Sequence, residues 1–320
     1  MKNQKSKLPL IAIIGPTAVG KTEISLQLAE RFNGEIISSD SRLFYRGMDI
    51  GTAKPSTEEM ARVPHHLINV ANPDEIWSLA KFQKAAQKAI ADIRARGKLP
   101  FLVGGTGQFY RAVTEGWLPP EVKADKALRK ELEKLEREKG NVWLHAKLMM
   151  LDPIAGEKID YRNVRRVVRA LEVILTTGER FSSQRKQRGE SPYDLLTIGL
   201  KRERPALYER VDLRIEQMFE AGLLDEVQNL LDAGYSADLP SMSALGYREA
   251  VSVLRGEMDV EEAKMLMRRS TRKFVRKQAN WFKDDDDGIK WFDARDPQVY
   301  IQIEKKIAHW LKNTTAEDDD

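Results

Sequence analysis

The 320-residue chain has no cysteine and four histidines. The lack of cysteine excludes disulfides, thiolate metal sites and cysteine catalysis, and the histidines lack the spacing of a zinc site. No apolar run approaches the roughly 18 residues of a transmembrane helix, and Leu8–Ile14 leads directly into a glycine-rich turn, so we expect neither a membrane span nor a signal peptide. Charged residues make up 32% and hydrophobic residues 42% of the chain, as in globular proteins. The lack of cysteine is compatible with a reducing cytosol, and we expect a cytoplasmic protein that is a monomer.

The octapeptide GPTAVGKT, from Gly15 to Thr22, matches the phosphate-loop pattern G-x-x-x-x-G-K-[ST] at every fixed position. A strand expected at 10–14 precedes it and a helix expected at 23–32 follows it, which is the context that the motif requires. In such a turn the backbone N–H groups and the helix dipole form a cradle for phosphate oxygens. Lys21 would reach the terminal phosphate, and the Thr22 hydroxyl would hold Mg²⁺. The predicted site, for a diphosphate or a triphosphate, consists of Gly15, Pro16, Thr17, Ala18, Val19, Gly20, Lys21 and Thr22.

Strands and helices alternate over residues 10–115, which predicts an α/β fold with a parallel sheet and right-handed crossovers, similar to the P-loop NTPases. Ligands of such sheets bind beyond the carboxyl ends of the strands. The phosphate loop, Asp40 and Gly104–Thr106 each follow a predicted strand and are expected to converge. The segments on which this depends are strands at 35–39, 67–70 and 99–103 and a helix at 77–96.

The alternation stops at Trp117-Leu118-Pro119-Pro120, and residues 125 to about 188 are charged and helical in pattern. A strand is expected again at 195–200, followed by long helices at 205–233 and 260–282. We therefore predict a P-loop core with C-terminal helices, residues 1–118 and 190–320. Residues 119–189 would be a helical insertion.

Two polar features near the predicted strand ends could carry chemistry. Asp40 would face the bound phosphates and could bind Mg²⁺ through water or act as a general base, or it could cap the next segment. Arg210 and Arg214 are spaced i, i+4 and could bind an anionic leaving group together. Alternatively, they lie on an exposed helix with Glu209 and Glu216 as partners.

Basic residues are concentrated in two segments, although the net charge is only +4. Arg162, Arg165, Arg166 and Arg169 share one face of a helix expected over 161–175, which is either a track for a nucleic-acid backbone or a solvated face. A second basic segment spans 267–282. Its Phe274 and Trp281 would be on the apolar side, where core packing is favoured over base stacking.

The segments GPTAVGKT, SSDSRLFYRGMDIGTAKP, VPHHLI, FLVGGTGQFY, LPSMSALGYRE and RKQANWF occur in this order and resemble the tRNA dimethylallyltransferases, the bacterial tRNA isopentenyltransferase family. The resemblance covers about residues 8 to 295. It implies transfer of a dimethylallyl group from dimethylallyl diphosphate to N6 of adenosine 37 in tRNA, with release of pyrophosphate. It also implies tRNA and the diphosphate as partners, with Mg²⁺ as cofactor.

The resemblance assigns roles by position. Asp40 would be the general base, Arg210 would assist pyrophosphate departure, and Thr106 would act with them at the catalytic site. This chain has Leu43 where many members have Gln, and Ser243 where some have Arg, differences that concern individual RNA contacts and not the reaction. The implied tRNA contacts are Asp40, Ser41, Arg42, Leu43, Thr106, Arg129, Arg165, Arg166, Val167, Val168, Arg169, Ser243, Ala244, Leu245, Gly246, Tyr247, Arg248, Arg276, Lys277 and Gln278.

Two other functions compete with this one: a P-loop kinase of a nucleoside or small molecule, and a non-catalytic nucleic-acid-binding ATPase. A kinase would need neither of the two basic segments. Both rivals are weakened because the strand at 101–103 ends in Gly104-Gly105, not in the Asp or Asp-Glu of a second NTPase motif. The residues leave open whether a nucleotide binds the phosphate loop.

Overall fold

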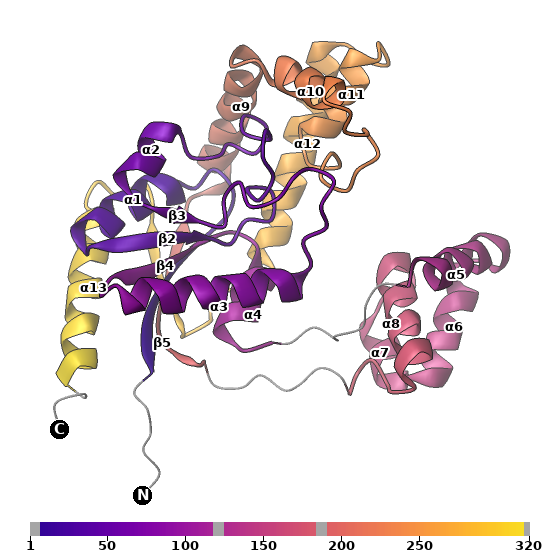
Figure 1. The fold of residues 1–320 in the computed structure, drawn as a ribbon, viewed down its shortest axis with the longest axis horizontal. Helices are drawn as coiled ribbons and strands as arrows, with labels where there is room; N and C mark the ends of the chain where they lie inside the picture. Colours follow the sequence, from indigo (N-terminus) through magenta and orange to yellow (C-terminus); the bar gives the residue numbers. More distant parts are fainter. Residues whose placement is uncertain (1–6, 118–124, 184–190, 317–320) are drawn as a thin grey trace, which may run out of the picture. The chain divides into compact units, whose positions relative to one another are not determined.

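The computed structural model describes residues 7–117, 125–183 and 191–316. The chain divides into two compact units (Figure 1). The first, which we call the core unit, consists of Met1–Thr114 and Ser191–Asp320. The second, the helical unit, consists of Glu115–Glu190.

The core unit is built on a parallel sheet, as predicted. Its described residues form six strands in the order β3-β2-β4-β1-β5-β6, and every neighbouring pair is parallel. The carboxyl ends of all the strands therefore meet at one edge. The strands are β1 (Leu8–Ile14), β2 (Gly34–Ser38), β3 (His65–His66), β4 (Leu99–Gly104), β5 (Tyr193–Lys201) and β6 (Ile289–Asp293).

Two strand predictions differ from the structure. No strand occupies 67–70 in this described segment; the strand there is β3, at His65–His66. Leu67 and Asn69 have φ of +62° and +55°, so the backbone leaves the extended region. The Asn69 side chain accepts a hydrogen bond from Lys54 Nζ at 2.6 Å. The short strand β6 was not predicted.

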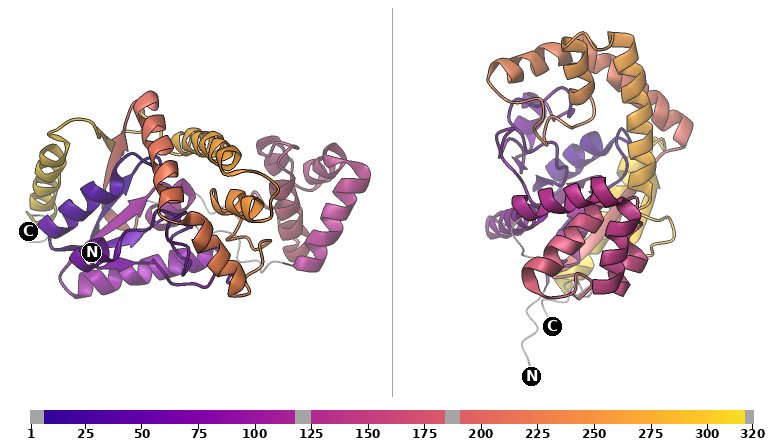
Figure 2. Two further views of the ribbon diagram at one scale, coloured as in Figure 1. Left: turned by 90° about the horizontal axis from the view of Figure 1, so that it is seen from above. Right: turned by 90° about the vertical axis from the view of Figure 1, so that its right-hand side faces the viewer.

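Helices cover both faces of the sheet (Figures 1 and 2). On one side α1 (Lys21–Arg31) packs on β2 and β4, and α13 (Val299–Ala316) packs on α1, β5 and β6. On the other side lie α3 (Leu79–Ala95) and α4 (Gly107–Thr114). The short helix α2 (Thr57–Arg62) contacts α1. Among the described residues, no helix is both long and apolar enough to cross a membrane.

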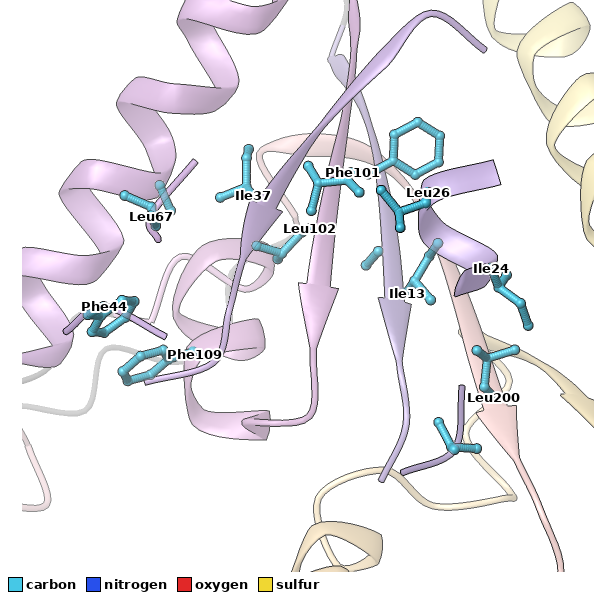
Figure 3. Packing of buried hydrophobic residues seen from close by; sticks show 14 of the residues in the cluster. Ile13, Ile24, Leu26, Ile37, Phe44, Leu67, Phe101, Leu102, Phe109 and Leu200 are labelled. Carbon is cyan, nitrogen blue, oxygen red and sulfur yellow. The ribbon is translucent and has the colours of Figure 1, made fainter. Parts of the chain in front are cut away.

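The core lies between the sheet and these helices, and Figure 3 shows part of it. Ile13 of β1 and Leu102 of β4 are fully buried or nearly so, with Leu26 of α1 close by. On the α3 and α4 side, the rings of Phe82 and Phe109 stack with centroids 4.2 Å apart. Burial of side chains of this size contributes roughly 1.5–3 kcal/mol each.

Four further helices of the core unit form the region beside the carboxyl edge of the sheet (Figure 1). Helix α9 packs on α12, and α10 packs on α11. The single helix predicted over 205–233 was wrong, because Gly222, at φ +93°, separates α9 from α10. The bounds are α9 (Arg204–Glu220), α10 (Leu223–Asp232), α11 (Tyr247–Leu254) and α12 (Val260–Ala279).

The helical unit has a core of its own. Its described helices are α5 (Lys126–Lys139), α6 (Asn141–Leu151), α7 (Pro153–Lys158) and α8 (Val164–Thr177). Leu144 and Leu148 of α6 pack with Val167 and Leu171 of α8. The helical prediction over 125 to about 188 is therefore confirmed between 126 and 177, with breaks between the helices. It was wrong for residues 178–183, which form no helix because Gly178, at φ +73°, ends α8; positions 184–188 lie outside the described residues.

A buried carboxylate stabilises the core unit at the start of β2. The Glu35 side chain is 4% exposed and binds His66 Nε2 at 2.6 Å, Arg96 at 2.5 Å and Lys98 Nζ at 3.0 Å. Burial alone would raise the pKa of Glu35, but hydrogen bonds from these three side chains outweigh it and lower the pKa from 4.5 to about 2. Because the folded-state pKa is depressed, this stabilisation is complete above about pH 4.5 and is lost as the pH falls toward 2.

We expect Glu35→Gln to lower the free energy of unfolding at pH 7 by about 3 kcal/mol, the value that such a pKa shift implies. The difference from the wild type should shrink as the pH falls below 4.5. Urea unfolding at a series of pH values measures both effects, with the exposed Glu220→Gln as control. A loss at pH 7 no larger than that of the control would contradict this role.

Candidate functional site

A cavity of about 1160 Å³ opens at the carboxyl edge of the sheet, within the core unit. The structure brings together there the three segments that the sequence placed at strand ends. Residues 40–43, residues 103–108 and five residues of the phosphate loop line the cavity: Thr17, Ala18, Gly20, Lys21 and Thr22. The other three loop residues, Gly15, Pro16 and Val19, do not line it, and Val19 is fully buried. Much of the remaining wall comes from residues 51–55, from α9 and α12, and from residues 243–245 with Arg248; Glu59 and Trp281 also line it.

The phosphate loop joins β1 to α1 in a conformation that needs residues tolerant of positive φ. Gly15, Ala18 and Gly20 have φ of +152°, +65° and +113°. A Cβ on Gly15 would also lie 2.6 Å from the carbonyl oxygen of Leu200, so the position has no room for a side chain. Gly20 is the N-cap of α1, so the N-terminus of that helix opens on the cavity. This is the backbone geometry in which N–H groups and a helix dipole bind an anion.

Lys21 lies inside this loop. Its Nζ donates to the carbonyl oxygens of Gly15 at 3.0 Å and Pro16 at 2.8 Å. Burial lowers the pKa of Lys21 from 10.5 to about 8, the negative charge of Asp40 opposes this shift, and the positive charge of Arg214 adds to it. An anion beside Nζ would therefore restore a charge that burial weakens.

Asp40 follows β2 and is half-buried at the cavity wall. Its Oδ1 accepts the N–H of Arg42 at 3.0 Å, which closes a turn two residues long and fixes the carboxylate. The Arg42 guanidinium in turn donates to the carbonyl oxygen of Pro240 at 3.2 Å, which ties this turn to the C-terminal half of the chain. The carboxylate charge acts on both Lys21 and Arg214 across the cavity. Asp40 is thus a fixed negative group among cations.

The two arginines of α9 both line the cavity. Arg210 Nε donates to the carbonyl oxygen of Ala18 at 2.8 Å, so this side chain holds the phosphate loop. Arg214 lies one turn further on, and burial lowers its pKa while the charge of Asp40 opposes that shift. Glu216 instead binds Lys264 and Arg268 of α12. The resemblance assigned a role to Arg210 only, although the i, i+4 spacing already indicated Arg214.

The cavity also has an apolar part of its wall. Phe274 of α12 and Trp281 beyond it are 40% and 37% exposed, and both line the cavity with Leu213 of α9. The prediction that these two aromatic side chains pack in the core was wrong, because α12 buries Val275 and Gln278 instead. The cavity can therefore take an apolar group or a flat base next to an anion.

The other predicted site residues of the core unit fall into two groups. Ser41, Leu43, Thr106, Ser243, Ala244 and Leu245 line the cavity with Arg248, whereas Tyr247 is fully buried. The Tyr247 hydroxyl donates to Glu226 at 2.5 Å, and Glu226 also accepts the backbone N–H groups of Asp49 and Ile50, at 2.8 and 2.7 Å. Gly246, at φ +95°, is the N-cap of α11. Tyr247 thus fixes the DIGTAKP loop at the cavity rim.

Helix α12 presents its basic residues in two ways. Arg268 binds Glu216 and Arg272 binds Asp212. Further along, the predicted RNA contacts Arg276 and Lys277 are exposed, while Gln278 is buried. The outer surface of the helix is therefore cationic at its C-terminal end.

In the helical unit, the arginine face is shorter than predicted. Helix α8 begins at Val164, so Arg162 precedes it. Arg129 and Arg169 both bind the fully buried Glu172, at 2.9 and 2.6 Å. Two predicted positions, Val167 and Val168, have their side chains in the core. Arg165 and Arg166 are the exposed cations of the first turn.

The comparisons with known proteins agree on one family. The family model described as IPP transferase matches residues 43–285. A tRNA dimethylallyltransferase of Roseiflexus sp. (strain RS-1) is 53% identical over 276 residues, covering 86% of this chain and 90% of that protein. The crystal structure of the full-length tRNA isopentenylpyrophosphate transferase from Bacillus halodurans has a TM-score of 0.73 and 43% identity, covering 98% of this chain and 100% of that one. A eukaryotic dimethylallyltransferase acting on tRNA has a TM-score of 0.80 and 28% identity, covering 97% and 80%.

Proposed function

This chain belongs to the IPP transferase family, and on that basis we propose that it transfers a dimethylallyl group from dimethylallyl diphosphate to N6 of adenosine 37 in tRNA, in the cytoplasm. One observation carries the proposal: an intact phosphate loop, a carboxylate and an apolar wall share one cavity. The names of the relatives favour this reaction over a small-molecule kinase.

The diphosphate would bind at the N-terminus of α1. The backbone N–H groups of the loop would bind its oxygens, and Lys21 would exchange its carbonyl partners for phosphate oxygens. Arg210 and Arg214 would meet the negative charge that grows on the departing pyrophosphate. The isoprenoid tail would lie against the apolar wall of Leu213 and Phe274.

The loop also suits Mg²⁺. Thr22 lines the cavity in the first turn of α1, and the Asp40 carboxylate faces the same space. Mg²⁺ commonly keeps several waters and uses one or two protein oxygens beside phosphate oxygens, so this donor set is sufficient. When bound, Mg²⁺ would neutralise charge on the leaving pyrophosphate.

Asp40 would act as the general base. An exocyclic adenine amine is a weak nucleophile whose N–H is not acidic, so its proton must leave as the new bond forms. The bond from N6 to the allylic carbon forms while the bond from that carbon to the diphosphate oxygen breaks, and the electron pair leaves with pyrophosphate. The proton passes to the Asp40 carboxylate, which the turn at Arg42 holds in place. The Thr106 hydroxyl lines the same cavity and would act together with this general base.

The adenine would have to leave its stack to enter this cavity, as in other enzymes that modify bases. The RNA would then be held through its backbone by exposed cations, among them Arg165, Arg166, Arg276 and Lys277. Incubation of the purified protein with tRNA, dimethylallyl diphosphate and Mg²⁺, without nucleotide, tests the reaction by nucleoside mass spectrometry. We expect a dimethylallylated adenosine; a strict need for ATP would favour the kinase or ATPase.

Asp40→Asn should slow the single-turnover rate by roughly 10²–10⁴-fold, because the amide cannot accept the proton. Binding of tRNA should change little, since the residue keeps its size. Glu59→Gln is a matched control, because Glu59 also lines the cavity but caps α2. A near-normal rate in the Asp40 variant would remove the residue from this role.

Binding of dimethylallyl diphosphate should protonate Lys21. The free side chain has a pKa of about 8, and the anion raises it, so affinity should fall as the pH rises above 8. At pH 8.5 we expect net uptake of part of a proton on binding, whereas the phosphate oxygens, with a last pKa near 6, contribute little. Calorimetry in two buffers of different ionisation enthalpy measures this. Lys21→Arg, which stays charged, should show no uptake; uptake equal to the wild type would contradict the assignment.

Replacing Arg165 and Arg166 together with Gln should weaken tRNA binding and reduce the slope of log Kd against log salt by about 1 to 2. Affinity for the diphosphate should not change. The control is the double variant Lys84→Gln, Lys305→Gln, which removes two positive charges from exposed positions on helices that do not line the cavity. An unchanged slope in the arginine variant would make this surface a solvated face.

A further inference from the structure

Gln278 joins two loops of the site from a buried position. It lies in the last turn of α12 and is 5% exposed. Its Oε1 accepts the backbone N–H of Thr17, in the phosphate loop, at 2.9 Å. Its Nε2 donates to the carbonyl oxygen of Gly105, in the turn after β4, at 3.1 Å. One amide thus connects three segments that are far apart in sequence.

The chemistry of the partners fixes the orientation of this amide. A backbone N–H can only donate and a carbonyl oxygen can only accept, so exchange of Oε1 and Nε2 would break both hydrogen bonds. The space is also built for it. A Cβ on Gly105 would lie 2.5 Å from Gln278 Nε2 and 2.8 Å from the carbonyl oxygen of Gly15, so a larger residue there would displace the amide or the phosphate loop.

We propose that Gln278 is a positioning residue for the diphosphate site and not a contact of the RNA. The inference deepens the proposed function and rests on it. Its neighbours Arg276 and Lys277 are exposed and suited to RNA, but the Gln278 side chain turns inward and both ends of its amide are bound to backbone. The sequence resemblance had grouped all three as RNA contacts.

The reason that the loop needs such a group is its conformation. Ala18, next to Thr17, has φ of +65°, which is costly for a residue with a side chain. Gln278 at Thr17 and Arg210 at Ala18 hold two consecutive residues of the loop from α12 and α9. With Thr17 N–H directed at the amide, the loop is preorganised, so an incoming diphosphate does not have to order it.

Binding of inorganic pyrophosphate with Mg²⁺, measured by calorimetry without tRNA, reads this role directly. Gln278→Ala should weaken pyrophosphate binding by about 10-fold or more, because both hydrogen bonds of the side-chain amide are lost. The affinity for tRNA in the absence of diphosphate should stay within about 2-fold of the wild type. Arg276→Ala is the matched control and should do the reverse, because Arg276 is exposed on the same turn of α12 and does not line the cavity. A Gln278→Ala protein that loses tRNA affinity and keeps pyrophosphate affinity would make Gln278 an RNA contact and overturn the proposal, as would one that keeps both.

Gln278→Glu separates positioning from general damage to the fold, because the deficit of this one variant relative to the wild type is compared at two pH values. A protonated carboxyl group can accept from Thr17 and donate to Gly105, whereas the ionised form cannot donate. The deficit in pyrophosphate affinity relative to wild type should therefore shrink as the pH is lowered from 8 to 5.5. A deficit independent of pH would overturn the proposal. The dimethylallyl transfer assay on the wild type is read separately: pyrophosphate binding without transfer would contradict the proposed function and leave this inference intact.

Discussion

The site depends on finding partners for the backbone of the phosphate loop, because a turn with several positive φ angles does not satisfy its own polar groups. Two of those partners come from far along the chain: Gln278 binds Thr17 across 261 residues, and Arg210 binds Ala18 across 192. The loop therefore has these partners only when α9 and α12 are packed beside the sheet. The same two helices supply the apolar and cationic walls of the cavity, so loop conformation and substrate surface are set together.

The charged side chains of this cavity are distributed unevenly around it. Lys21, Arg210 and Arg214 gather on the loop side, and Asp40 is the carboxylate that faces them. Burial disfavours the charged forms of Lys21 and Arg214 and lowers their pKa. An anionic ligand therefore interacts more strongly with them here than it would with an exposed cluster of cations. A diphosphate at the loop would have cations around its phosphates, and the cavity that holds its attached carbon also has an apolar wall. That arrangement suits departure of pyrophosphate on one side and attack by an amine on the other.

The sequence predicts those parts of the fold and site that depend on local pattern. The motif at Gly15–Thr22 identifies the loop with β1 and α1 around it, and the parallel-sheet rule brings Asp40 to the same edge. Features that depend on tertiary packing are not predicted. Gly222 looks like a tolerated helical glycine until its φ of +93° separates α9 from α10. Phe274 has the apolar character of a core residue, but its side chain is partly exposed and lines the cavity. Periodicity likewise could not show that Arg169 is bound to the buried Glu172.

The central claim is that the phosphate loop and Asp40 act on one bound diphosphate, and a crystal structure with Mg²⁺ and a non-reactive thio analogue of dimethylallyl diphosphate tests it most directly. The account predicts phosphate oxygens at the N-terminus of α1, with Lys21 Nζ moved from the carbonyl oxygens of Gly15 and Pro16 onto the ligand. It also predicts the allylic carbon in the space between the loop and the Asp40 carboxylate, with room there for an adenine amine. A diphosphate bound away from the loop, or an allylic carbon shielded from Asp40, would contradict it.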